Sequence, residues 1–211
     1  MTRTTRWLLI AAAALAAVLG LSLTFVLRSS GSDGSTFGSA TDAATTWKAG
    51  EQRAPALSLH DEHGKPISLA SLRGRPVIVT FIDPLCRDYC PTEAQHLNDV
   101  VHAAAVKPTI VAVSVNTAGN APANLALDRR KWSLVPQWRW AVGTSADLAR
   151  VWKAFHVMVL VTRKTVAGVE VQQVSHTEAA YLIDAQGFQR ALFLWPYTAD
   201  AVGAELRATS P

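Results

Sequence analysis

Two cysteines separated by three residues are the side chains in this chain most able to do chemistry. Cys86 and Cys90 are the only cysteines among 211 residues, and Pro91 follows directly. Two neighbouring thiols can cycle between dithiol and disulfide, or they can bind a soft metal ion together. A structural disulfide would close so small a loop that it would remove little chain entropy. The spacing leaves a redox pair and a metal site as the main alternatives.

The cysteines lie where a buried strand is predicted to give way to a helix. Residues 77–82 form a nearly continuous β-branched and apolar run, typical of a strand buried on both faces. Proline suits the first helical position and pushes the preceding residue away from helical dihedrals, so we expect Cys90 to cap the helix. A thiolate there faces the positive end of the helix dipole, which predicts a lowered pKa for Cys90.

A third candidate ligand lies much further along the chain. His176 comes just before a predicted core strand at 181–184. In an α/β fold of the kind that the strand and helix order predicts, we expect the loop at this place to lie against the turn that carries the cysteines. Cys86, Cys90 and His176 would then offer two thiolates and one imidazole. That set suits copper(I), with copper(II) and zinc as alternatives.

The rest of the pattern predicts one α/β domain. Short apolar or β-branched runs predict strands at 56–59, 67–69, 77–82, 109–115, 157–161, 169–174, 181–184 and 191–194. Apolar residues at helical spacing predict helices after Pro91, at 125–132, at 146–155 and at the end of the chain. A β-α-β unit followed by an antiparallel pair and a helix is a thioredoxin-like plan. Here it carries an N-terminal β-hairpin and an extra hairpin insertion.

An apolar segment near the N-terminus predicts export. Residues 7–27 are 21 uncharged residues, enough for a helix across the roughly 30 Å hydrocarbon core. Arg3 and Arg6 precede this span, which predicts a single-pass cell-membrane protein with a cytoplasmic N-terminus and an extracytoplasmic domain. A long signal cleaved near residues 38–40 is the alternative, and both alternatives export the domain.

We therefore divide the chain into three parts. Residues 1–28 are the predicted membrane anchor, residues 29–50 a Ser/Gly-rich flexible linker, and residues 51–211 the thioredoxin-like domain. The 20 Lys and Arg exceed the 16 Asp and Glu, but three of the arginines lie in residues 1–28. The remainder is close to neutral and has no strongly basic run, so we expect no nucleic-acid partner.

The motif Cys86-x-x-x-Cys90-Pro91, together with His176-Thr177 and the strand at 181–184, resembles the Sco/SenC family of membrane-tethered, thioredoxin-like copper proteins. The similarity covers residues 52–209. It implies that Cys86, Cys90 and His176 bind one copper ion, as Cu(I) and also as Cu(II). It further implies a metallochaperone that serves a copper acceptor such as a cytochrome c oxidase subunit, with a thiol reductant protein as a second partner.

Three positions beside these ligands depart from the family pattern. Arg87 stands where the family usually has proline, and Ser175 stands where an acid often precedes the histidine. The lead-in at 83–85 is Asp-Pro-Leu instead of the commoner aromatic-Thr-x. Such changes alter charge and hydrogen bonding around metal ligands. They indicate a divergent member.

A thiol–disulfide oxidoreductase using Cys86 and Cys90 is the main alternative function. Such enzymes typically have two residues between their cysteines and a cis-proline before the facing strand. Here the spacing is one residue longer, and no proline occurs between Pro136 and Pro196. These differences favour metal transfer, which needs no turnover chemistry, so we do not predict an enzyme.

Overall fold

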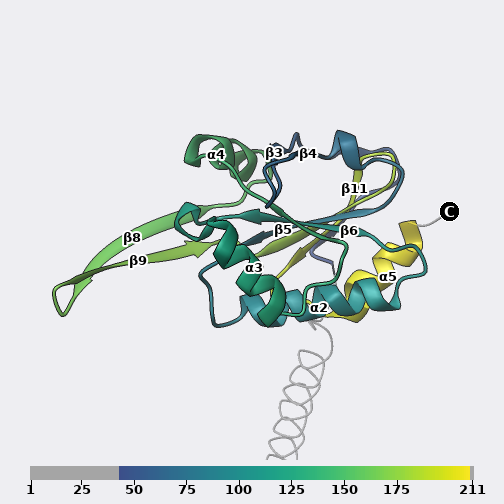
Figure 1. Ribbon diagram of the computed structural model, residues 1–211. Coiled ribbons are helices and arrows are strands. Elements are labelled where there is room, and N and C mark those ends of the chain that lie inside the picture. The colour runs from purple at the N-terminus through teal and green to yellow at the C-terminus, as the bar shows by residue number, and fades with distance from the viewer. Residues whose placement is uncertain (1–42, 210–211) are drawn as a thin grey trace, which may run out of the picture. The chain divides into compact units, whose positions relative to one another are not determined.

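The computed structural model describes residues 43–209 of the chain (Figure 1). The predicted anchor at 1–28 and most of the predicted linker at 29–50 lie outside these residues. Within the described part of the chain, no helix is both long and apolar enough to cross a membrane.

A mixed sheet of seven strands forms the centre of the domain. Its strands follow the order β1-β11-β10-β5-β6-β7, and β2 also pairs with β11. Their bounds are β1 Thr45–Thr46, β2 Gln52–Arg53, β5 Val77–Ile82, β6 Thr109–Ser114, β7 Trp138–Ala141, β10 Ala179–Ile183 and β11 Phe188–Leu194. β5, β6 and β7 are parallel, whereas β10 runs antiparallel to both β5 and β11. Parallel neighbours need a crossover, and helix α2 (Cys90–Ala103) supplies it between β5 and β6.

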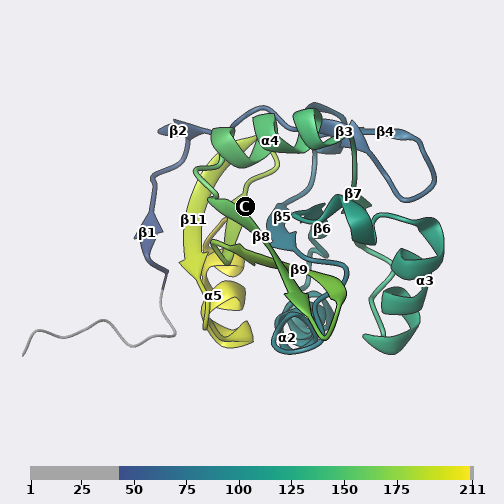
Figure 2. The same cartoon turned by 90° about the vertical axis from the view of Figure 1, so that its left-hand side faces the viewer.

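Helices and a short hairpin cover the two faces of this sheet. Every residue of β5, β6 and β10 is buried, as their apolar composition predicts. Alternate side chains face opposite layers, so Ile78 packs with Leu97 of α2 whereas Phe81 packs with Leu148 of α4. The other helices are α3 (Pro122–Lys131), α4 (Ser145–Ala154) and α5 (Ala199–Thr209), with short 3₁₀ turns at Ala70–Leu72 and Thr117–Gly119. Helices α2 and α5 lie on one face, and α4 lies on the other with the β3–β4 hairpin (Figures 1 and 2).

Both predicted hairpins are present. β3 (Ser58–His60) pairs with β4 (Pro66–Ser68), and β8 (Val159–Val166) pairs with β9 (Val169–His176). The β8–β9 hairpin is longer than predicted and extends away from the central sheet (Figure 1). In both views β9 lies on the side of this hairpin nearer to α2, whereas β8 lies nearer to α4 (Figures 1 and 2). The strand that ends at His176 is therefore the one nearer to α2, whose first residue is Cys90.

The sheet begins inside the segment predicted as linker. Thr45 pairs with Leu192 and Thr46 with Ala191, although both threonines are exposed. Strand pairing uses backbone groups and requires no apolar side chain. A polar composition therefore did not reveal this edge strand at residues 45–46.

Candidate metal centre

A short loop after β5 carries Cys86, and Asp83 organises it. The Asp83 Oδ1 accepts the N–H of Leu85 at 2.7 Å, and the Asp83 carbonyl accepts the N–H of Cys86 at 3.0 Å. The other carboxylate oxygen of Asp83 accepts a hydrogen bond from Asn116 Nδ2 at 3.2 Å. Since Asn116 follows β6, these bonds tie the loop to the ends of two neighbouring strands. They leave Cys86 half-buried.

Cys90 is the first residue of α2, and Tyr89 occupies the cap position. Tyr89 has φ −97° and ψ −23° and makes no side-chain capping bond. The prediction that Cys90 caps the helix is therefore wrong by one position. A proline is tolerated in the first helical turn because the N–H groups there have no carbonyl partner within the helix. Cys90 is only 1% exposed and packs in the core with Ala94.

The two thiols share a proton unequally. A hydrogen bond from Cys90 lowers the pKa of Cys86 from 9.0 to about 6. The same hydrogen bond, together with burial, raises the pKa of Cys90 well above its ordinary value. The predicted lowering at Cys90 is thus wrong, because burial penalises a thiolate there while the proton of Cys90 stabilises one at Cys86. At neutral pH, Cys86 is the thiolate of the pair.

His176 ends β9 with one ring nitrogen unpartnered. Its Nδ1 lies 3.1 Å from the carbonyl oxygen of Thr177. A carbonyl can only accept, so Nδ1 carries the proton in this bond and the lone pair is on Nε2. That Nε2 is buried and has no hydrogen-bond partner among the described residues. An imidazole held through Nδ1–H with a bare Nε2 is the usual arrangement of a histidine metal ligand.

One cavity brings Cys86 and His176 together. It has a volume of about 520 Å³ and lies between the cysteine loop and the end of β9. Cys86, Arg87 and Asp88 line it from the loop, and residues 172–176 line it from β9. Cys90 reaches it only through its hydrogen bond to Cys86. Among the side chains that the structure describes, no three from His, Cys, Asp or Glu lie close enough to hold one metal ion. The three-ligand set therefore stays a prediction.

The residues present nevertheless fit a soft metal ion. They comprise a thiolate at Cys86, a second thiol hydrogen-bonded to it, and a histidine that lines the same cavity and has a buried, unpartnered Nε2. Sulfur and imidazole ligands are those that copper(I) prefers. When bound there, copper would supply a soft cation able to exchange between thiolate ligands.

Sequence analysis did not single out Glu93 as part of this region. Glu93 is fully buried one helical turn after Cys90, and its Oε1 accepts hydrogen bonds from Thr80 at 2.5 Å and Tyr197 at 2.7 Å. Burial raises its pKa from 4.5 to about 7, against the effect of those two bonds. A Glu three residues after a cysteine on a predicted helix was the available signal, since positions i and i+3 share a face.

Comparison with known families and structures identifies the domain. The model of the SCO1/SenC family matches residues 47–210. The chain belongs to the SCO1/SenC family. This confirms the resemblance drawn from the cysteine and histidine motifs. No curated protein matches the chain.

Solved Sco structures share the fold at low sequence identity. Bradyrhizobium japonicum ScoI with copper bound is 24% identical, with a TM-score of 0.64 over 75% of this chain and 99% of that one. Yeast Sco1 with copper bound is 19% identical, with a TM-score of 0.65 over 74% and 87%. BsSco, described as having a disulfide switch and as a member of the Sco family of cytochrome c oxidase assembly proteins, is 20% identical, with a TM-score of 0.58 over 80% and 96%. These similarities confirm the thioredoxin-like α/β fold of this SCO1/SenC domain.

Proposed function

We propose that this SCO1/SenC protein binds one copper ion through Cys86, Cys90 and His176 and passes it to an acceptor protein. The observation that carries the proposal is the buried, unpartnered Nε2 of His176, a residue that lines one cavity together with Cys86. A buried polar atom without a partner is unfavourable unless a ligand completes it.

Each residue has a distinct part in this proposal. Cys86 is the entry ligand, because its pKa of about 6 leaves it deprotonated at neutral pH. Cys90 holds the shared proton and must release it to bind as a second thiolate, so binding liberates a proton. His176 completes the site when the end of β9 closes on the cysteine loop. His176 lies at the end of a long hairpin outside the central sheet, so this end of β9 would move together with the hairpin and without disturbing the sheet.

The related structures support copper as the cargo and an oxidase as the destination. ScoI and Sco1 were both solved with copper bound, and BsSco belongs to the cytochrome c oxidase assembly proteins. We propose a cytochrome c oxidase subunit as acceptor, with residues 7–27 holding the domain beside it on the extracytoplasmic side of the membrane. A thiol reductant protein would keep Cys86 and Cys90 able to bind.

Copper(I) titration of the reduced full-length protein in detergent, against a chromophoric competitor, tests the proposal. We expect one tightly bound copper per chain. His176→Ala should weaken binding at least about 100-fold, because losing even an outer-sphere partner costs 10–100-fold. His102→Ala, which removes an exposed histidine of α2, is the matched control. Binding that is indifferent to His176 would overturn the three-ligand site.

Thiol–disulfide exchange is the second candidate function. The low pKa of Cys86 favours it, because a thiolate with a resolving cysteine beside it is an attacking nucleophile. Weak copper binding, combined with rapid reduction of a disulfide substrate that depends on Cys86, would place the protein with the oxidoreductases.

A further inference from the structure

Arg87 connects the cysteine loop to helix α3. Its Nη1 donates hydrogen bonds to the carbonyl of Cys86 at 2.7 Å and to the carbonyl of Pro84 at 3.0 Å. The same nitrogen lies 3.4 Å from Oδ1 of Asp128 on α3. One guanidinium nitrogen therefore joins the backbone on both sides of residue 85 to a carboxylate from another element.

Asp128 is an unusual anchor because it is buried and almost unsatisfied. Its side chain is 0% exposed, and neither carboxylate oxygen accepts a hydrogen bond within the described residues. Burial raises the pKa of Asp128 to about 6, while Arg87 and more weakly Lys131 oppose this shift and Asp83 adds to it. Breaking a buried pair is strongly unfavourable because it leaves an uncompensated charge. Asp128 therefore restrains Arg87 more firmly than an exposed carboxylate would.

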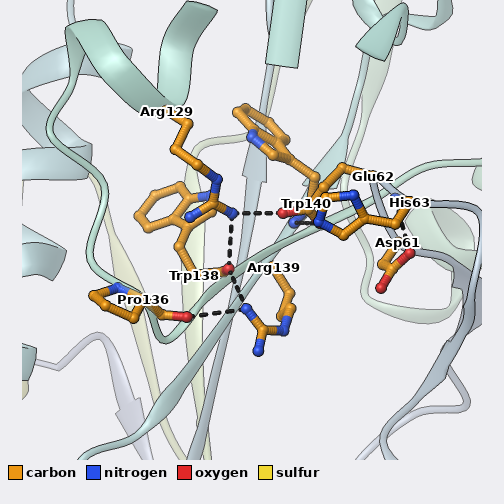
Figure 3. Close-up of polar contacts among 8 residues, drawn as sticks. All are labelled: Asp61, Glu62, His63, Arg129, Pro136, Trp138, Arg139 and Trp140. Carbon is orange, nitrogen blue, oxygen red and sulfur yellow. Dashed lines mark hydrogen bonds and ion pairs between the residues drawn. The ribbon is translucent and has the colours of Figure 1, made fainter. Parts of the chain in front are cut away.

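The residue after Asp128 on α3, Arg129, fixes this part of the helix to the sheet (Figure 3). Arg129 donates to Glu62 Oε1 at 2.5 Å and to the carbonyl of Trp138 at 3.0 Å. The other oxygen of Glu62 accepts the N–H of Trp140 at 3.0 Å. α3 is thus held against β7 at the position adjacent to Asp128.

We propose that the Arg87–Asp128 pair is a positioning device that holds the backbone of Cys86 in place, so that its sulfur lies beside both Cys90 and the cavity shared with His176. This role rests on the proposed copper function. A proline at residue 87 would restrain the loop through its ring. Here the hydrogen bonds of Arg87 to two loop carbonyls, together with its ion pair to the buried Asp128, restrain the loop instead.

A double-mutant cycle on the full-length protein tests this role. Asp128→Asn should weaken copper(I) binding about 10-fold, the size expected when a residue supporting a ligand is lost. Arg87→Pro supplies its own restraint and should stay within about threefold of wild type. In the Arg87→Pro background, adding Asp128→Asn should change affinity less than about twofold, because the restraint no longer passes through Asp128. Asp99→Asn, an exposed acid on α2, is the control and should change nothing.

The alkylation rate of Cys86 by iodoacetamide, at fixed pH and without copper, gives a second readout. Asp128→Asn should change it about threefold or more, because a displaced loop presents the Cys86 sulfur differently to the cavity that it lines. Urea unfolding of the same variants separates this effect from general destabilisation. Should Asp128→Asn fold poorly, the apolar pair Arg87→Met with Asp128→Leu replaces both charges together, which cores usually tolerate. This double variant should show the same loss of copper affinity and the same change in alkylation rate as Asp128→Asn.

Two outcomes would overturn the positioning role. One is wild-type copper affinity and alkylation rate in Asp128→Asn. The other is an equal effect of Asp128→Asn in the wild-type and Arg87→Pro backgrounds. Failure of the copper proposal would look different, since copper binding would then ignore His176→Ala while the alkylation rate still responded to Asp128.

Discussion

At the scale of single residues, the unequal sharing of one proton between Cys86 and Cys90 determines which sulfur reacts. Burial holds the proton on Cys90, and its hydrogen bond leaves Cys86 as the thiolate near neutral pH. Only the half-buried sulfur is therefore presented both to the cavity and to approaching partners. The buried sulfur is available second, once its proton has left.

Replacing Cys90 by serine or by alanine separates the hydrogen bond from the thiol. The hydroxyl introduced by Cys90→Ser would still donate to Cys86, so the thiolate absorbance of that variant should titrate near 6. Cys90→Ala removes the donor, and the midpoint should move up toward the ordinary value of 9.0. The measurement is ultraviolet absorbance of the thiolate against pH. A common midpoint near 9.0 in both variants would contradict the assignment of the lowered pKa to this bond.

Glu93 should make the stability of the domain depend on pH. Its folded-state pKa of about 7 exceeds the ordinary 4.5, so between these values the folded state binds the extra proton. Stability should therefore be greatest below pH 4.5 on account of this group and decline as pH rises to 7, by up to about 3 kcal/mol. Urea unfolding of wild type and Glu93→Gln across this range measures it. The difference between the two proteins should change with pH, and a constant difference would refute the prediction.

At the scale of elements, one side chain of α2 joins the helix to the connection between α3 and β7. Asn98 Nδ2 donates to the carbonyls of Trp132 and Ser133, each at 3.2 Å, and its Oδ1 accepts the N–H of Val135 at 3.2 Å. Asn98, Trp132 and Val135 are buried whereas Ser133 is exposed, so the groups of Trp132 and Val135 have little access to water. The single side-chain amide of Asn98 thus makes the hydrogen bonds to this connection that a neighbouring strand would otherwise make.

Asn98→Ala should therefore destabilise the domain by about 2 to 3 kcal/mol, since it removes three hydrogen bonds and leaves the buried N–H of Val135 without this acceptor. Gln95→Ala is the matched control, because Gln95 is exposed and makes one bond to the Trp132 carbonyl. That control should lose no more than about 1 kcal/mol. Urea unfolding compares the two, and equal losses would show that burial of Asn98 is not the cause.

The elements that sequence patterns predicted are those with strong local signals. β5 and β6 are continuous apolar runs, and α2 has a proline in its first turn, so each was predictable within a residue or two. The pairing of Thr45 with Leu192 had no such signal, because it uses backbone atoms alone. Likewise, Arg87 and Asp128 meet only through the fold, and no local pattern connects them. The asymmetry of the thiols required the burial of Cys90, which the motif does not contain.

At the scale of the whole molecule, the proposed membrane attachment has a direct test. Alkaline phosphatase fused after residue 211 should be active in a bacterial host, because this enzyme requires the oxidising side of the membrane. The same enzyme fused after residue 5, before the apolar segment at 7–27, is the control and should be inactive. An inactive C-terminal fusion would place the domain in the cytoplasm, where it could not reach the extracytoplasmic acceptor that we propose.

The central position of β5 has a consequence for how the chain is made. One neighbour of β5 is β6, which follows soon after in the sequence, but the other is β10. Thr80 of β5 donates a hydrogen bond to the carbonyl of Ala179 on β10, 99 residues later in the chain. At about 5–20 residues per second, synthesis leaves β5 without its second neighbour for on the order of 5 to 20 s. For most of this interval both cysteines exist without His176, beside an open strand edge that can pair with other chains. The two thiols are thus synthesised well before the segment that carries His176 and β10.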